Sequence, residues 1–139
     1  MKFAILLLSC FYILNTAAQA PGSLDPTFAT IGYASYGPVS TTSFDNAQDV
    51  VTLPNGQMVF CGTAGTTGNL EMCVVRLNAD GTIDNTFGTN GYYLHSNPSG
   101  SDFAYDMEVL ANGQILVAGA LSITAANPQF ALICLNPNG

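Results

Sequence analysis

Two pairs of aspartates are the side chains whose types and spacing best suit chemistry. Asp45 and Asp49 lie four residues apart in a segment that we expect to be extended, so they share one face, and Asp102 and Asp106 repeat the pair. Paired carboxylates serve in glycoside hydrolysis and in calcium binding. The alternative is structural, because aspartates at the start of a strand hydrogen-bond to backbone N–H groups. Recurrence favours the structural role, since a catalytic pair is needed once and a fold-building contact is needed in every unit.

A second acidic segment has oxygen-bearing residues at spacings similar to those of a calcium loop. Asn78, Asp80 and Asp84 surround Gly81, but the closing bidentate glutamate of such loops is missing. Later in the chain, the position equivalent to Asp80 holds the neutral Asn138. Asn, Asp and Gly form tight turns without metal, so we expect a turn here and no metal site.

Histidine and cysteine chemistry is not indicated. His95 is the only histidine and the cysteines do not cluster at ligand spacing, so neither a Ser-His-Asp triad nor a zinc site is supported. Cys61 and Cys73 lie on strands that we expect to be antiparallel neighbours, and both a cross-strand disulfide and two buried free thiols remain open. Cys134 leaves the number of cysteines after the N-terminal segment odd. We therefore predict no catalytic, cofactor-binding or metal-ligating residue and no cofactor.

Four aromatic residues recur at equivalent positions, Phe28 with Phe87 and Tyr33 with Tyr92. Such rings could form stacking platforms for sugars. A ring that recurs once per unit more often fills the gap between neighbouring units, because each ring buries a large apolar area. We therefore expect these four residues to pack in the core.

The N-terminal residues have the layout of a secretory signal peptide. Lys2 precedes an apolar run, which small residues follow. We interpret residues 1–18 as the signal peptide, with cleavage possible up to residue 20. Polar residues interrupt the run, which is shorter than the roughly 20 residues that a bilayer requires, so we expect no transmembrane segment in the mature chain.

The charge of the mature chain limits its partners. Removal of Lys2 takes the formal net charge from −7 to −8 and leaves Arg76 as the only Lys or Arg beside nine Asp and Glu residues. A chain this acidic repels polyanions, which excludes nucleic acid as a partner. Cations, neutral glycans and basic proteins remain compatible with this charge.

The remainder of the chain repeats itself with an offset of about 58 residues. The aligned segments are 23–33 with 82–92, 45–62 with 102–119, and 77–81 with 135–139. We divide the chain into repeat unit 1, residues 23–81, and repeat unit 2, residues 82–139. The chain stops where a third copy would start.

The pattern within each unit predicts an all-β fold. Apolar residues alternate or form short runs between turn residues, and no segment has helical periodicity. Asn55-Gly56 and Asn112-Gly113 predict tight hairpins with type I′ turns, in which both central residues have positive φ. The expected strands are residues 33–40, 49–53, 57–62 and 70–77, then 92–96, 106–110, 114–119 and 129–135. Antiparallel four-stranded units of this length are typical of β-propeller blades, whereas a β-sandwich would not require a fixed period.

Three motifs are specific as a set. They are Leu24-Asp25-Pro26-Thr27-Phe28, Leu53-Pro54-Asn55-Gly56-Gln57 with the apolar strand that ends at Gly62, and residues 75–88. Together they resemble the delta-60 repeat family over essentially all of the mature chain. The resemblance implies a β-propeller-like fold in a large bacterial protein, secreted or at the cell surface. It also implies further repeats and, often, a C-terminal sorting domain for outer-membrane export.

We expect a non-catalytic extracellular or cell-surface β-propeller repeat scaffold for binding or adhesion, with a protein or a neutral glycan as its ligand. The alternatives are a secreted polysaccharide-acting enzyme whose active site lies outside this chain, and a calcium-stabilised structural array. Two blades cannot close a ring, because propellers use about 4 to 8, and they leave unpaired strand edges. We therefore expect an N-terminal fragment of a longer polypeptide with further repeats. An assembly of several copies is the less favoured explanation.

Overall fold

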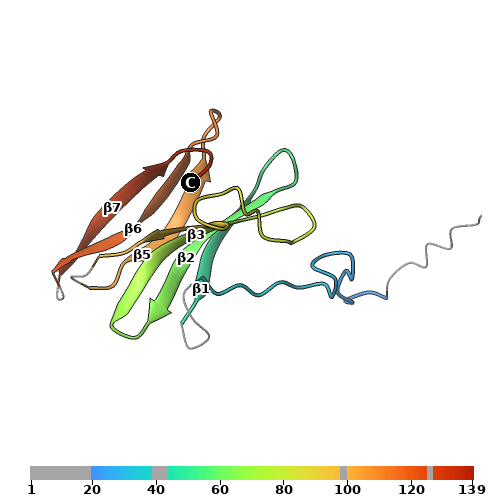
Figure 1. The fold of residues 1–139 in the computed structure, drawn as a ribbon, viewed down its shortest axis with the longest axis horizontal. Helices are drawn as coiled ribbons and strands as arrows, with labels where there is room; N and C mark the ends of the chain where they lie inside the picture. The colour runs from blue at the N-terminus through green and yellow to red at the C-terminus, as the bar shows by residue number, and fades with distance from the viewer. Residues whose placement is uncertain (1–19, 39–43, 98–99, 125–126) are drawn as a thin grey trace, which may run out of the picture.

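The computed structural model describes residues 20–38, 44–97, 100–124 and 127–139 (Figure 1). The signal peptide expected at residues 1–18 lies outside these ranges. The described chain forms seven strands and no helix. The strands are β1 (Asn46–Thr52), β2 (Met58–Thr66), β3 (Asn69–Leu77), β4 (Tyr92–His95), β5 (Phe103–Val109), β6 (Ile115–Thr124) and β7 (Asn127–Leu135). The predicted all-β, antiparallel fold is confirmed.

The strands form two antiparallel sheets. Sheet 1 has the order β1-β2-β3-β4 and sheet 2 has the order β5-β6-β7. β4 lies in repeat unit 2 by sequence but pairs with β3 of unit 1, with Tyr92 opposite Val75 and His95 opposite Met72. Sheet 1 therefore takes its fourth strand from the beginning of the following repeat, and the structural unit is offset from the sequence repeat.

The strand expected at residues 33–40 is not formed over residues 33–38, and residues 39 and 40 lie outside the described chain. Tyr33 is the counterpart of Tyr92, and the segment that starts at Tyr92 pairs with the third strand of the preceding sheet. No strand precedes β1 in the described residues, so the segment from Tyr33 has no such preceding partner among them. The expectation was wrong because strand formation here depends on a neighbour that the local pattern does not reveal.

The two predicted hairpins are present, but their turns differ from the prediction. The Gly56 N–H donates to the Leu53 carbonyl at 2.9 Å and the Leu53 N–H donates to the Gln57 carbonyl at 2.7 Å. Three residues thus lie between the paired ends, and Gly56 alone among them has positive φ, at 84°. The loop length explains the difference, because a three-residue hairpin loop favours a type I turn followed by one left-handed residue, whereas a type I′ turn belongs to a two-residue loop. The second hairpin has the same geometry at Gly113.

A bulge interrupts the first strand pair of each sheet at the same place. The register shifts between Ala47 and Asp49 in sheet 1 and between Ala104 and Asp106 in sheet 2. Glycine lies opposite in both cases: a Cβ atom on Gly62 would lie 1.9 Å from the Asn46 carbonyl oxygen, and one on Gly119 would lie 1.9 Å from the Phe103 carbonyl oxygen. The bulge requires a residue without a side chain, which explains why this glycine recurs.

The core lies between the two sheets, where β5 contacts β1, β2 and β3 (Figure 1). Apolar side chains from the facing strands interdigitate there and are fully or almost fully buried. Sheet 1 and sheet 2 contribute similar numbers of them: Val59, Cys61, Met72 and Val74 from the first, and Ala104, Met107, Ile115, Val117 and Leu135 from the second. Phe87, which follows β3, completes the cluster and is 0% exposed.

Candidate functional site

The first aspartate of each pair binds the backbone of its own sheet. Asp45 Oδ1 accepts a hydrogen bond from the Gly65 N–H at 3.3 Å, and Asp102 Oδ1 accepts one from the Ser122 N–H at 2.8 Å. Gly65 and Ser122 occupy equivalent places late in β2 and β6. Asp102 is fully buried, and its Oδ2 atom has no hydrogen-bond partner among the described residues. Both carboxylates therefore have the same structural task in the two units.

The second aspartate of each pair binds backbone at the bulge. Asp49 Oδ1 accepts from the Val50 N–H at 2.8 Å, and Asp106 Oδ1 accepts from the Met107 N–H at 3.0 Å. Asp49 Oδ2 also reaches sheet 2 and accepts from the Met107 N–H at 3.1 Å. The four aspartates thus make the backbone contacts that their recurrence predicted, and Asp49 in addition connects the two sheets.

A polar cluster centred on Arg76 was not predicted from the sequence. The Arg76 Nε–H donates to Asp84 Oδ2 at 2.7 Å, and Nη1 donates to the Pro137 carbonyl at 2.6 Å. Its guanidinium carbon lies 4.8 Å from the centroid of the Phe87 ring. The sequence offered one signal for this cluster: Arg76 is the only Lys or Arg besides Lys2, and it precedes Asp84 by eight residues.

Phe87 and the final turn also belong to this cluster. We call Arg76, Asp84, Phe87 and residues 136–139 together the joint. The Gly88 N–H donates to the Asn138 carbonyl at 2.7 Å. A Cβ atom on Gly139 would lie 3.2 Å from the Phe87 ring, and Gly139 has a φ of 89°. The joint therefore connects β3 of sheet 1 and the segment after it with the end of sheet 2.

The first repeat makes the same loop contact without the arginine. The Ala29 N–H donates to the Asp80 carbonyl at 2.7 Å, and a Cβ atom on Gly81 would lie 2.8 Å from the Phe28 ring. Asp25, the counterpart of Asp84, is exposed and accepts hydrogen bonds from the Thr27 N–H at 2.9 Å and hydroxyl at 2.7 Å. The phenylalanine of each motif thus packs on the glycine turn that ends the same repeat.

The segment that resembles a calcium loop is a turn, as expected. Asp80 Oδ1 accepts hydrogen bonds from the Thr82 N–H at 3.0 Å and from the Thr82 hydroxyl at 2.7 Å. Asn78 donates through Nδ2 to the Thr82 hydroxyl at 3.0 Å. Within the described ranges, no group of three or more His, Cys, Asp and Glu side chains is arranged to hold a metal ion.

The pKa of Asp84 is lowered to about 2, first by the hydrogen bond from the Thr86 hydroxyl and then by the Thr86 N–H and Arg76. A carboxyl that is more acidic in the folded state stabilises the fold above its unfolded pKa and loses this contribution as the pH falls through its folded pKa. We therefore expect the urea midpoint to fall between about pH 4 and about pH 2. Asp84→Asn should make this fall smaller; an unchanged slope in the variant would contradict the assignment. Some dependence should remain, because Thr27 and Thr82 also lower the pKa of Asp25 and Asp80.

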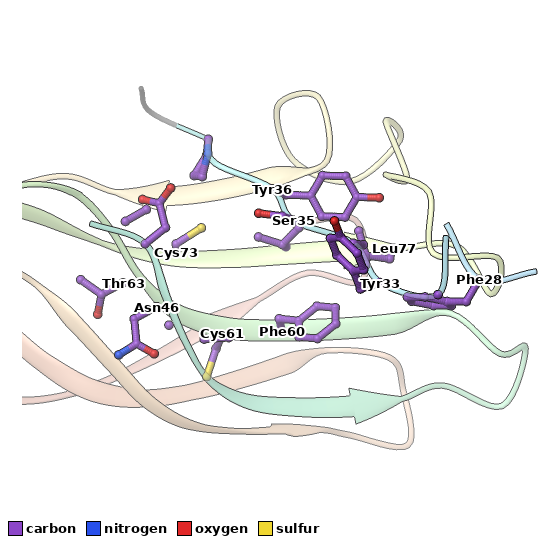
Figure 2. Close-up of a pocket in the computed structure, with 18 residues that line it drawn as sticks. Phe28, Tyr33, Ser35, Tyr36, Asn46, Phe60, Cys61, Thr63, Cys73 and Leu77 are labelled. Carbon is purple, nitrogen blue, oxygen red and sulfur yellow. The ribbon is translucent and has the colours of Figure 1, made fainter. Parts of the chain in front are cut away.

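A cavity of about 520 Å³ lies between residues 28–38 and the outer face of sheet 1 (Figure 2). Tyr33, Tyr36 and Phe60 contribute aromatic walls, and Asp45 and Thr63 contribute polar groups. The Tyr36 hydroxyl donates a hydrogen bond to the Gly81 carbonyl, which holds residues 28–38 against sheet 1. The lining is mainly apolar, which suits the burial of another apolar group more than it suits acid–base chemistry.

The structure decides between the two possibilities left open for Cys61 and Cys73. Cys61 lies opposite Val74 and Cys73 lies opposite Gly62, so the two side chains project from opposite faces of sheet 1 (Figure 2). Both are free thiols, as is the exposed Cys134. Burial, followed by the nearby carboxylates, raises the pKa of Cys61 to about 11 and that of Cys73 to about 12. Because the thiolate is the nucleophile, neither residue suits nucleophilic catalysis at neutral pH.

The remaining expectations have mixed outcomes. Phe87 is in the core, as expected. Phe28 and Tyr92 are only partly buried and lie outside the core cluster, so core packing was wrong for these two rings. Tyr33 is 58% exposed, so its expected burial was wrong. His95 is partly buried at the end of β4, where its Nδ1 atom lies 3.5 Å from the Tyr93 hydroxyl.

Both repeats match a family model described as a "Domain of unknown function (DUF5122) beta-propeller", over residues 53–87 and 110–139. The two matched segments are β-propeller-like repeats. The first match contains β2, β3 and the joint residues up to Phe87, and the second contains β6, β7 and the final turn. Sheets 1 and 2 are thus two blades of an incomplete propeller. No curated protein and no solved structure matches the chain. The described residues contain no helix that is long and apolar enough to cross a membrane.

Proposed function

We propose that this chain is a non-catalytic β-propeller scaffold of the delta-60 type, secreted or displayed at the bacterial cell surface, that serves in binding or adhesion. One observation carries the proposal: the four aspartates best suited to chemistry all hydrogen-bond to backbone N–H groups at equivalent places in the two blades. Their positions are thus explained by the fold. The signal-peptide layout of residues 1–18 supports export.

The net negative charge of the chain favours a neutral ligand over a polyanionic one. Nine carboxylates beside one remaining arginine repel polyanions, and Arg76 itself is buried in the joint. Neutral polysaccharides do not suffer this repulsion, and they are also the substrates of the alternative enzyme. One assay can therefore test both functions.

We expect the folded chain to be retained on at least one insoluble neutral polysaccharide, among cellulose, xylan and starch granules, without releasing new reducing ends. Protein depletion from the supernatant measures retention, and a reducing-sugar assay measures cleavage. The heat-unfolded chain is the control for non-specific adsorption. Release of reducing ends by the purified chain would overturn the non-catalytic function, and equal retention of the unfolded control would overturn specific glycan binding.

A further inference from the structure

The outer face of sheet 2 exposes apolar residues whose counterparts in sheet 1 are buried. Phe130 is fully exposed and Leu132 is 68% exposed, whereas the equivalent residues of β3, Met72 and Val74, are both 0% exposed. Met72 and Val74 are buried because sheet 2 packs against them. A strand with exposed apolar side chains and an unpaired backbone edge is a surface for association with another chain.

The outer face of sheet 1 is the complementary surface. Val50 is 52% exposed, whereas its counterpart Met107 is 7% exposed and packs against sheet 1. Phe60 is partly buried and lines the cavity, whereas its counterpart Val117 is 0% exposed in the core. The cavity of Figure 2 therefore lies over the face that, in sheet 2, contacts the preceding blade.

The edge of sheet 2 also lacks the strand that sheet 1 has. β4 pairs with β3 through Tyr92 opposite Val75 and Leu94 opposite Cys73. No strand pairs with the free edge of β7 in the described chain, and residues 33–38 form no strand although they correspond to β4. Sheets 1 and 2 thus form one complete blade-to-blade contact. The outer face of sheet 1 with residues 33–36, and the outer face of sheet 2 with the edge of β7, are the two surfaces that a second such contact would need.

We infer that β7 of one copy takes residues 33–36 of a second copy as its fourth strand, while the outer face of sheet 1 of the second copy covers Phe130 and Leu132. The internal contact sets the register: Tyr33 lies opposite Ile133, and Ser35 lies opposite Ala131. Residues 33–38 leave their own cavity, and the Phe28 motif stays on the Gly81 turn. Asp106 then accepts from the Val50 N–H of the second copy, as Asp49 accepts from the Met107 N–H within one chain.

This contact joins different surfaces of two identical chains. Each copy in a pair therefore has one of the two surfaces still free to bind a further copy. Such heterologous contacts close into rings when the rotation between copies permits. Propellers use about 4 to 8 blades, so a ring in which each copy contributes sheets 1 and 2 needs about two to four copies.

Light scattering coupled to size-exclusion chromatography tests the contact on the exported chain. We expect a mass of two to four copies, and one copy for the variant Phe130→Glu/Leu132→Glu. Ile31→Glu is the matched control, because Ile31 is 54% exposed and its counterpart Asn90 stays exposed beside the internal contact. A wild-type mass of one copy at the highest soluble concentration overturns the inference, as does dissociation by Ile31→Glu alone.

Disulfide trapping tests the register independently. In a Cys134→Ser background, chains with Ser35→Cys are mixed with chains with Ala131→Cys under mild oxidation. Opposed residues of antiparallel strands have Cα atoms about 4.5–5.5 Å apart, which suits a disulfide. Ala34→Cys is the control, because its side chain projects from the opposite face. We expect cross-linked dimers with Ser35→Cys and at least tenfold fewer with Ala34→Cys; equal yields from the two, or none, would overturn the proposed strand pairing.

Discussion

Replacing Arg76 with methionine is expected to lower the free energy of unfolding by about 3–5 kcal/mol, the usual effect of removing one partner of a buried ion pair. Asp84, which is 6% exposed beside Arg76, would lose its cation, and the Pro137 carbonyl would lose its donor. A domain of this size has a total stability of about 5–15 kcal/mol, so the variant should be close to unfolding. Urea denaturation followed by far-UV circular dichroism measures the change.

Two further variants separate the ion pair from side-chain packing. Arg76→Lys keeps the charge but cannot bond Asp84, Thr86 and the Pro137 carbonyl together, so it should recover only part of the stability. Asp84→Asn should be much more destabilising than Asp25→Asn, because Asp25 is exposed and has no arginine. Similar losses for these two asparagine variants would show that the joint does not depend on Arg76.

Replacing Gly119 with alanine is expected to cost about 3 kcal/mol, at the upper end for overpacking, and to lower the melting temperature by about 10 °C. The added Cβ atom would lie 1.9 Å from the Phe103 carbonyl oxygen and 2.7 Å from Met72 Cε. The methionine can move, but the backbone carbonyl belongs to the bulge between β5 and β6. Differential scanning calorimetry measures the loss.

Gly62→Ala is the equivalent change in the first blade and should have a similar effect, because its Cβ atom would lie 1.9 Å from the Asn46 carbonyl oxygen. Gly68→Ala is the control for clash: nothing lies within 4 Å of its Cβ position, and only its φ of 89° opposes the change. That strain costs about 1 kcal/mol. A loss from Gly119→Ala no larger than the loss from Gly68→Ala would show that the bulge accommodates the added Cβ atom, and would contradict the prediction.

Much of the candidate site was predictable because its contacts are local. The aspartates of the two pairs each bind an N–H of their own blade, and the recurrence of these residues at a fixed offset was enough to favour that role. The position of the hairpins followed from Asn55-Gly56 and its counterpart, although each loop has three residues and a different turn from the one predicted. Arg76 was not assigned a role because its partners include Pro137, which is 61 residues away.

The sequence by itself determined that the chain is all-β, that it repeats about every 58 residues and that its turns contain Asn, Asp and Gly. These properties depend on alternation and on backbone preferences of neighbouring residues. Only the tertiary structure decided that β4 belongs to the sheet of the preceding repeat and that Cys61 and Cys73 face opposite ways. Strand partners and register are set where segments distant in the chain meet, and the local pattern that makes a strand does not specify which edge it joins.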